Sequence, residues 1–418
     1  MNSNTYLGYM YSYPHKTAYR EFSPPVQIAP YLHEMKGREG GLYFHIPFCK
    51  HKCGFCNLFS CTQHGKNLIN QYLRTMQCQT EQLLTLTEGL LFSSFTIGGG
   101  TPLVLNEEQI DQLWKIVNMF GVDPVNIDVS IETSPEFTDL SLLRHLKNNG
   151  VNRLSIGIQS FHDLELKKIG RAINSSLCRQ ALENISEVNF PNLNIDLIYG
   201  IEGQTIESFN QSISDALSYE PSELFLYPLY VREGTNVKNR AEDNDYLLMY
   251  EFARDRLTEC GFIQTSMRRF VKEKVCDFEF SCGDELMISC GCGGRSYIGD
   301  LHFSDFYSIN PKQVRQIIDN YIQRTDFTTV SNGYLLNKDE KTRRFIIKNL
   351  MYYNGIDKME FIRRFGVELS FDIFGYLKDE GFIVENSDFI RLTTKGMAYS
   401  DYIGQLFISD EVRNKMKV

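Results

Sequence analysis

Apolar residues in the first half of the chain gather in short runs, and longer segments with apolar residues every three or four positions separate them. The short runs predict β-strands, and the longer segments predict helices. The predicted strands are Gly41–Phe48, Leu91–Ile97, Asn126–Glu132, Arg153–Ile158, Asn192–Tyr199 and Glu223–Tyr230. The predicted helices are Asn67–Thr87, Glu107–Phe120, Asp139–Asn148, Asp163–Ile169, Ser175–Val188 and a segment that ends near Leu217.

This alternation predicts an α/β fold in which helices cover a parallel sheet. Because crossover connections have a fixed hand, such a sheet can curl into a partial or full (β/α) barrel. Binding and catalytic groups are then expected at the C-terminal ends of the strands. A cysteine cluster after Phe48 and a glycine-rich turn after Ile97 lie at such ends, so both are candidates for the site.

The two ends of the chain differ from this pattern. Four prolines interrupt residues 1–40, which are therefore predicted to form an irregular N-terminal arm lying on the main domain. A barrel domain with an extension is predicted over residues 41–335, and a separate module over residues 338–418. In that module the predicted elements are helices Lys341–Tyr352, Lys358–Phe365 and Phe371–Glu380, a hairpin within Phe382–Thr393 and a last helix Thr394–Phe407.

Helices followed by a small hairpin are typical of a compact winged-helix-like α+β module. Such a module can bind DNA, or it can serve as a lid or packing domain. The chain carries 43 basic and 52 acidic residues, a net charge of −9, which argues against general nucleic-acid binding. We therefore favour the lid or packing role and expect no nucleic-acid partner.

The composition is that of a globular protein, with 42% hydrophobic and 23% charged residues. No stretch approaches 18 consecutive apolar residues, so no membrane span is expected. Met1 to Pro14 lacks the basic start and apolar run of a signal peptide. The expected location is cytoplasmic.

Eleven cysteines, an odd number in a long chain, do not suggest a disulfide framework. Three of them, Cys49, Cys53 and Cys56, have the spacing C-x3-C-x2-C. Thiolates are the usual ligands of iron–sulfur clusters, and three ligands leave one iron of a four-iron cube free for a small chelating molecule. The alternative is zinc completed by Cys61 or His51, but no second C-x2-C pair follows at a suitable distance.

The cysteine spacing, the preceding LYFHIPF and the aromatic residue before the last cysteine resemble the radical S-adenosylmethionine (SAM) superfamily. The context resembles its oxygen-independent coproporphyrinogen III oxidase-like family, which also includes heme chaperones and class C radical SAM methyltransferases. The resemblance runs from about Tyr11 to Ile408. It implies a [4Fe–4S] cluster on the three cysteines and one or two bound SAM molecules. It also implies reductive cleavage of SAM to a 5′-deoxyadenosyl radical that abstracts a hydrogen atom from a substrate.

Further motifs match the SAM-binding loops of this family. They are GGGTP after a strand, IETSP at the end of the next strand, LSIGIQSF, KKIGRAIN and NIDLIYGIEGQT. The resemblance assigns Cys49, Cys53 and Cys56 to the metal and to catalysis. By the same resemblance, the SAM-binding residues are Tyr43, Phe55, Gly98, Gly99, Gly100, Thr101, Glu132, Gln159, Arg171 and Asp196.

Several positions depart from the family pattern. Leu58 stands where the decarboxylases of the family have a fourth cysteine, whereas the N-terminal YMYSYPHKTAYREF resembles their arm. Cys290 and Cys292 interrupt a glycine-rich stretch, and with Cys276 and Cys282 they could bind a metal or simply pack under the barrel. Arg268 and Arg269 lie in a segment that differs from the family, where they could pair with an anionic group or lie on the solvated surface.

These features support a radical SAM enzyme that acts on a small-molecule substrate and takes electrons from a donor such as flavodoxin or ferredoxin. Both a porphyrin-biosynthesis-type oxidoreductase and a methyltransferase fit the motifs. The alternative is a heme-binding chaperone that holds a cluster and turns over little, for which His45 and His51 are candidate ligands.

Overall fold

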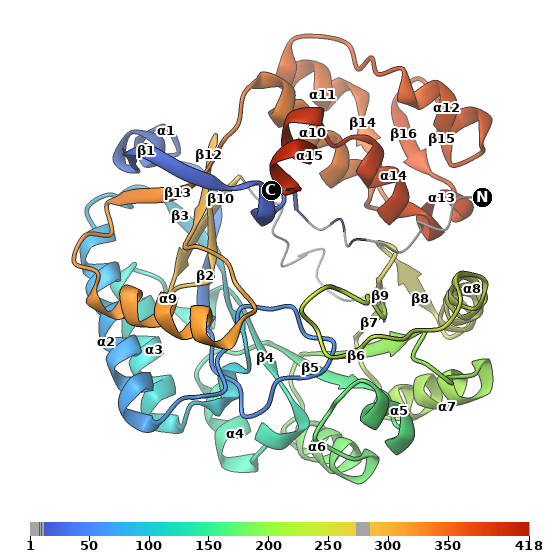
Figure 1. Cartoon of the computed structure of the whole chain (residues 1–418), viewed down its shortest axis with the longest axis horizontal. Coiled ribbons are helices and arrows are strands. Elements are labelled where there is room, and N and C mark those ends of the chain that lie inside the picture. Colours follow the sequence, from blue (N-terminus) through green and yellow to red (C-terminus); the bar gives the residue numbers. More distant parts are fainter. Residues whose placement is uncertain (1–7, 9, 11, 273–284, 418) are drawn as a thin grey trace.

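Seven neighbouring parallel strands form the centre of the structure, a computed structural model that describes residues 8, 10, 12–272 and 285–417 (Figure 1). Their spatial order is β10-β2-β3-β4-β5-β6-β7. The bounds are β2 Glu39–Ile46, β3 Leu91–Gly99, β4 Asp128–Thr133, β5 Arg153–Gln159, β6 Asn192–Tyr199, β7 Glu223–Pro228 and β10 Leu286–Cys290. The α/β class predicted from the sequence is confirmed.

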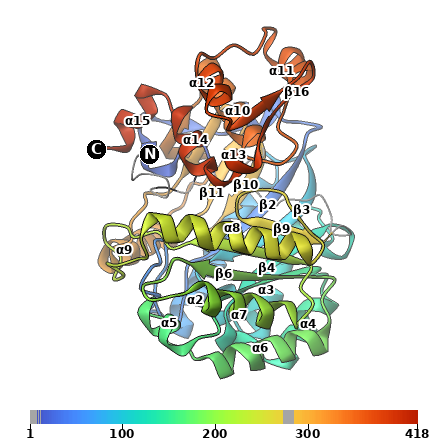
Figure 2. The same ribbon diagram turned by 90° about the vertical axis from the view of Figure 1, so that its right-hand side faces the viewer.

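Helices on the outer face of the curved sheet connect these strands (Figures 1 and 2). Polar residues such as Asn106, Asp139 and Thr205 cap the first turns of three of them, which fixes where each helix begins after its loop. The bounds are α2 Lys66–Leu83, α3 Glu107–Met119, α4 Leu140–Asn148, α5 Asp163–Lys168, α6 Ser175–Val188, α7 Ile206–Leu217 and α8 Asp243–Glu259.

The parallel strands alternate between apolar and polar side chains, and this alternation decides which face carries the site. In β6, Leu193, Ile195 and Leu197 belong to the main core, while Asn194 and Asp196 line a cavity on the concave face. Strands β3, β4 and β5 behave in the same way. A fully packed barrel would fill its interior with branched apolar residues. The polar inner face therefore leaves room for ligands.

Antiparallel strands extend the sheet on both sides without closing it. The full order is β1-β13-β12-β11-β10-β2-β3-β4-β5-β6-β7-β9-β8, and the edge strands β1 and β8 do not pair with each other. The sequence predicted either a partial or a full barrel, and the open sheet shows that the barrel is partial. The added elements are β8 Phe262–Gln264, β9 Arg269–Lys272, β11 Arg295–Ile298, β12 Leu301–Ser304, α9 Pro311–Gln323 and β13 Thr329–Leu335.

The C-terminal segment forms the first three predicted helices and the hairpin, but the last predicted helix, Thr394–Phe407, is broken at Tyr399 into two helices, and a further helix over Asp410–Met416 was not predicted. These elements pack around a second hydrophobic cluster of their own. One strand was missed because β14 has only two residues; it pairs with β16 to complete a three-stranded sheet. The bounds are α10 Lys338–Leu350, β14 Ile356–Asp357, α11 Lys358–Phe365, α12 Ile373–Asp379, β15 Ile383–Glu385, β16 Phe389–Leu392, α13 Thr394–Ala398, α14 Ser400–Leu406 and α15 Asp410–Met416. None of the helices that the structure describes has the length and hydropathy of a membrane span.

The N-terminal arm is more regular than the sequence suggests. It contains β1 Arg20–Gln27 and α1 Ala29–Glu34, whereas the four prolines predicted irregular chain. β1 is an edge strand, and its pairing with β13 shifts register between Glu21 and Val26, around its two prolines. Edge strands and bulges are where proline is tolerated. The preceding residues Tyr13 and Tyr19 belong to the C-terminal hydrophobic cluster, so the arm also packs on that module.

Candidate functional site

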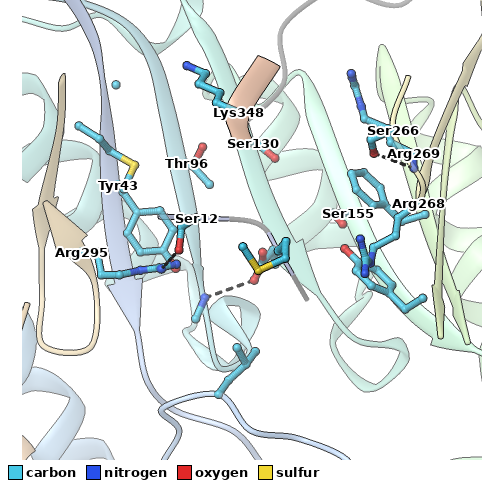
Figure 3. A pocket seen from close by; sticks show the side chains of 18 of the residues that line it. Ser12, Tyr43, Thr96, Ser130, Ser155, Ser266, Arg268, Arg269, Arg295 and Lys348 are labelled. Atoms are coloured by element: carbon cyan, nitrogen blue, oxygen red, sulfur yellow. Dashed lines mark hydrogen bonds between the residues drawn. The ribbon is translucent and has the colours of Figure 1, made fainter. Parts of the chain in front are cut away.

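A cavity of about 690 Å³ occupies the concave face of the sheet (Figure 3). Inward-facing residues from β2 to β7 form its floor, among them Tyr43, Thr96, Ser130, Glu132 and Asp196. The cavity is large enough for a cofactor-sized ligand. Of the residues that the sequence predicts to bind SAM, Tyr43, Gly99, Glu132 and Asp196 line it.

The loop that carries the three cysteines follows β2 and is held at both ends by backbone hydrogen bonds. Cys49 N–H donates to the Cys61 carbonyl at 3.0 Å, and Cys61 N–H donates to the Pro47 carbonyl at 2.6 Å. In the middle, Gly54 N–H donates to the Ile169 carbonyl at 2.9 Å. Cys49, Cys53 and Cys56 are thus presented from one fixed loop beside the ends of β2 and β5.

Burial favours the neutral form of two of these thiols, those of Cys49 and Cys56. Burial raises the pKa of Cys49 to about 12, although a hydrogen bond from Thr101 opposes the shift. Burial also raises the pKa of Cys56. The Arg171 guanidinium donates to Cys53 Sγ at 3.2 Å, which places a positive charge beside a thiolate ligand. A bound metal deprotonates a coordinating thiol, so this set suits an iron–sulfur cluster.

The glycine-rich turn after β3 packs directly against the cysteine loop. Gly100 N–H donates to the Ile46 carbonyl, and Thr101 Oγ1 lies 3.6 Å from Cys49 Sγ. A Cβ at Gly100 would stand 2.8 Å from that sulfur, and a Cβ at Gly98 would stand 3.0 Å from the Tyr43 hydroxyl. Glycine is needed here because the loops approach too closely for any side chain.

Two carboxyl groups face the cavity beside this turn. Glu132 accepts a hydrogen bond from Gly99 N–H at 3.2 Å, and Asp196 accepts one from the Asn194 amide at 2.7 Å. The surrounding protein raises the pKa of Glu132 by desolvation. Desolvation, together with the negative charge of Glu132, raises the pKa of Asp196 to about 7. A positively charged or hydroxyl-bearing ligand would stabilise the ionised form of both carboxyl groups by charge attraction or hydrogen bonding.

The other predicted SAM-binding residues lie around the cysteine loop and do not line the cavity. Gln159 sits on a β-bulge of β5 with a φ of 72°, a strained conformation that concentrates at functional sites. Arg171, whose second nitrogen donates to the Gly157 carbonyl, lies beside it. Phe55 packs its half-buried ring against the main core.

Cys61 and His51, the two residues that could complete a zinc site, both have other partners in the structure. The Cys61 thiol bonds to the Gln63 carbonyl of its own loop, and the His51 ring pairs with Glu136 at 3.8 Å. Within the described residues, no three His, Cys, Asp or Glu side chains form a ready single-ion site. The thiolates of a cube bind different irons, so they need not meet at one point as zinc ligands do. The three-cysteine loop therefore suits a cluster better than zinc.

Sequence reasoning missed a chain of buried ion pairs on the cavity floor. Glu223 accepts from Arg153 at 2.7 Å and from Arg269, while Arg153 donates to Ser130 at 2.9 Å. These two arginines outweigh desolvation and hold the pKa of Glu223 below its usual range. The available signal was polar residues at every second position of otherwise apolar strands.

The C-terminal module and the N-terminal arm roof the cavity. Lys348 on α10 lines it, and Arg295 donates to Ser12 of the arm at 2.8 Å (Figure 3). Arg268, expected either to pair with an anion or to be solvated, is buried and bonds to Asp401 of α14. Arg269 is likewise buried, so the solvated-surface alternative is wrong for both.

Cys290 and Cys292 behave as packing residues. Both are fully buried, and Cys290 Sγ lies 3.6 Å from the Thr80 hydroxyl of α2. The alternative of an extra metal site also involved Cys276 and Cys282, which lie outside the described residues.

Comparison with known proteins agrees with this geometry. Residues 43–216 match the family model described as the Radical SAM superfamily. The heme chaperone HemW of Buchnera aphidicola is 26% identical, with 88% of this chain and 98% of that protein covered. The oxygen-independent coproporphyrinogen III oxidase of Escherichia coli is 28% identical over 93% of this chain and 91% of that protein. Residues 43–216 thus carry a domain of the radical SAM superfamily, and over most of its length the chain is similar to proteins of the coproporphyrinogen III oxidase-like family.

The fold of this radical SAM protein also resembles a solved relative. The structure of Escherichia coli coproporphyrinogen III oxidase matches with a TM-score of 0.80 over 95% of this chain and 96% of that chain, at 24% identity. Membership of the family implies a [4Fe–4S] cluster and SAM. The cysteine loop, the close-packed glycine turn and the two cavity carboxyls are compatible with both.

Proposed function

We propose that this protein is a radical SAM enzyme that acts on an anionic small molecule bound in the cavity. The observation that carries the proposal is the contact between the cysteine loop and the glycine turn, at the edge of a cavity lined by carboxyl groups. When bound, the cluster and SAM together supply a one-electron reductive cleavage that yields a 5′-deoxyadenosyl radical. The chain supplies the binding groups, their orientation and a covered cavity.

In this proposal Cys49, Cys53 and Cys56 hold the cluster, and the Gly98–Thr101 turn receives the amino-acid end of SAM. Glu132 and Asp196 bind its polar and positively charged groups, helped by the Tyr43 hydroxyl. Arg171 and Gln159 hold the SAM side of the cysteine loop. Each assignment follows the family resemblance of the motif, and the position of the residue beside the turn, the cavity or the cysteine loop supports it.

The charge of the cavity supports an anionic substrate. Three acidic side chains, those of Glu132, Asp196 and Glu223, come from strands of the floor. Eight basic side chains also line it: Lys16, Arg153, Arg232, Arg268, Arg269, Arg295, Arg344 and Lys348. Five of these belong to the arm, the loop after β7, β11 and α10, so positive charge also comes from segments outside the floor strands β2 to β7. Carboxylate or phosphate groups of a substrate would be attracted there.

The decisive experiment is product analysis after anaerobic reconstitution with iron, sulfide, SAM and dithionite. We expect 5′-deoxyadenosine from the native chain and none from Cys53→Ala. Cys78→Ala, which changes an exposed cysteine on α2, is the matched control and should behave as the native chain. A chain that holds a full cluster but forms no 5′-deoxyadenosine, with or without a pool of anionic small molecules, would refute the proposal.

The same assay separates the two chemistries that the motifs allow. A methyltransferase would form S-adenosylhomocysteine together with 5′-deoxyadenosine, whereas a decarboxylating oxidoreductase would release carbon dioxide without S-adenosylhomocysteine. Leu58 in place of a cysteine sets the chain apart from the decarboxylases of the family.

A second candidate function is heme binding, because heme chaperones are among the most similar relatives. His45 is poorly suited as a heme ligand: its ring lies 3.2 Å from the Tyr43 hydroxyl and 3.3 Å from the Phe59 carbonyl. Burial also lowers its pKa to about 4. A heme titration tests this candidate. Stoichiometric growth of a Soret band in the native chain would support a chaperone. Loss of that band in a His51→Ala variant would identify His51 as the heme ligand, whereas its retention would assign heme binding to another residue.

A further inference from the structure

We propose that the outer surface around the cysteine loop is the docking site for an acidic one-electron carrier protein. The inference rests on the proposed function, because it assigns the entry point of the electron that the cluster needs. It concerns the solvent-exposed side chains of the loop, which do not line the substrate cavity. We call this surface the basic rim and define it as residues 50–56, 163–171, 232–240 and 305–312.

Backbone contacts hold the four segments of the basic rim together. Gly54 N–H donates to the Ile169 carbonyl, and the Gly54 carbonyl accepts from Asn236 at 2.8 Å and Val237 at 3.0 Å. Lys52 Nζ donates to the Ile309 carbonyl at 2.7 Å. In Figure 1 the blue loop after β2 runs beside the yellow-green loop that follows β7 and the orange loop that precedes α9. The rim is therefore one continuous surface built around Gly54, between Cys53 and Cys56.

Positive charge is concentrated on this surface, whereas the chain as a whole carries a net charge of −9. Apart from Arg232, which lines the cavity, and the buried Glu165, the four segments contain eight Lys or Arg and three Asp or Glu residues. Lys50 pairs with Glu136, and Lys168 pairs with Glu202. When these two glutamates, which lie outside the four segments, are included in the count, basic residues still outnumber acidic ones. The exposed lysines are Lys50, Lys167, Lys168, Lys238 and Lys312. An acidic partner would therefore be attracted to this surface, close to the cluster ligands, although the protein as a whole is acidic.

Exposed apolar side chains lie within or beside the same surface. Leu164 is 79% exposed, and it stands three and four residues before Lys167 and Lys168 on α5, hence on the same side of that helix. Phe306 is 52% exposed in the segment before α9. A few apolar residues ringed by charges are typical of a protein-docking surface. Electron-transfer complexes use small interfaces of this kind, with charge steering the encounter.

The chemistry of the site selects the class of partner. One electron passes from the reduced carrier to the oxidised cluster, so the carrier is oxidised by one electron and the cluster is reduced by one. No proton or group moves with it. The carrier must reach the cysteine loop from outside, and the lysines favour a carrier whose docking face is acidic.

The test uses a reduced, negatively charged flavodoxin as the carrier and dithionite as the small-molecule reductant. The variant Lys167→Glu/Lys168→Glu/Lys238→Glu reverses three charges of the basic rim without touching a proposed cluster or SAM ligand. The matched control, Lys36→Glu/Lys115→Glu/Lys338→Glu, reverses three exposed lysines on other elements. Cluster reduction is followed by stopped-flow absorbance, and carrier binding by biolayer interferometry, over a series of salt concentrations.

We expect the rim variant to be reduced by flavodoxin at least tenfold more slowly than the native chain at low salt, with carrier binding weakened in parallel. The native rate should fall steeply as salt rises. The control variant should stay within twofold of native, and dithionite should reduce all three chains equally. Equal flavodoxin rates in the rim variant and the control would overturn the docking site. Failure of dithionite to produce 5′-deoxyadenosine from any chain would instead count against the proposed function.

Discussion

Asp196 is the residue whose ionisation should make SAM binding depend on pH. Its pKa is raised to about 7, so the carboxyl is largely neutral at pH 6 and largely ionised at pH 8. SAM carries a positive sulfonium, which favours the ionised form. If only the ionised form binds, a pKa of 7 makes SAM bind up to about tenfold more tightly at pH 8 than at pH 6. Isothermal titration at the two pH values measures this ratio.

Asp196→Asn is the control for that prediction. An amide of the same shape does not ionise, so its SAM affinity should be weaker at pH 8 and nearly the same at both pH values. An unchanged pH ratio in the Asp196→Asn variant would assign the dependence to another group, of which Glu132 is the neighbour with a raised pKa.

Gly100 tests how tightly the glycine turn and the cysteine loop are fitted together. In Gly100→Ala the new Cβ would lie 2.6 Å from the Phe48 carbonyl oxygen and 2.8 Å from Cys49 Sγ. Because backbone must move to make room, we expect a loss of about 1–3 kcal/mol in the free energy of unfolding and at most half of the native iron content. Iron assay after reconstitution and urea unfolding measure both. Gly375→Ala on α12, where no atom lies within 4 Å of the added methyl, should keep native iron content.

At the scale of elements, Glu165 ties the loop after β5 to the loop after β6. This buried carboxylate accepts from Ser160 at 2.6 Å, from Gln204 at 3.0 Å and from Ser208 at 2.6 Å. In Glu165→Ala these donors lose their acceptor in a buried site, which should cost about 3 kcal/mol of unfolding free energy. Urea unfolding measures the loss. Glu165→Gln should recover most of the lost unfolding free energy, because a serine hydroxyl can accept a hydrogen bond from the new amide as well as donate one. Equal losses in the two variants would instead indicate that the negative charge of Glu165 is what stabilises the loops.

The elements that the sequence predicted well are those with a clear local signal. The central strands and their helices appear within a few residues of their predicted bounds, since each carries its own apolar periodicity and several helices carry a cap. β1 and β14 were missed because one contains two prolines and the other is two residues long. Neither strand has a local pattern, and only pairing with β13 and β16 makes them strands.

The candidate site divides in the same way. The cysteine loop, the glycine turn, Glu132 and Asp196 could be predicted as candidates because each stands in a short, continuous motif that resembles the family. Arg153, Glu223 and Arg269 were missed, because their pairing across β5, β7 and β9 depends on which strands become neighbours. Arg295 on β11 and the roof residues Arg344 and Lys348 come from segments far apart in the chain, and no local pattern relates them to the cavity.

At the scale of the whole molecule, an open sheet requires another part of the chain to cover its concave face. The C-terminal module does this, and one of its links to the barrel is the buried pair of Asp401 on α14 and Arg268 before β9. Tyr230, which follows β7, also donates to Asp401, and the Met10 N–H of the arm donates to it at 3.1 Å. Arm, barrel and module thus meet at one carboxylate beside the cavity.

Replacing Asp401 by leucine should loosen this junction. Arg268 would keep its charge in a buried place without that partner, which costs about 3–5 kcal/mol. We expect a lower urea midpoint and faster hydrogen exchange in α13, α14 and β9, while the cluster loop, which lies elsewhere, keeps its native iron content. The double variant Arg268→Met/Asp401→Leu removes both charges, and apolar pairs often replace buried ion pairs with little loss. It should therefore recover most of the stability lost in Asp401→Leu. If the double variant is as unstable as the single one, the carboxylate acts mainly through Tyr230 and the arm, and the module is held by hydrogen bonds and not by the ion pair.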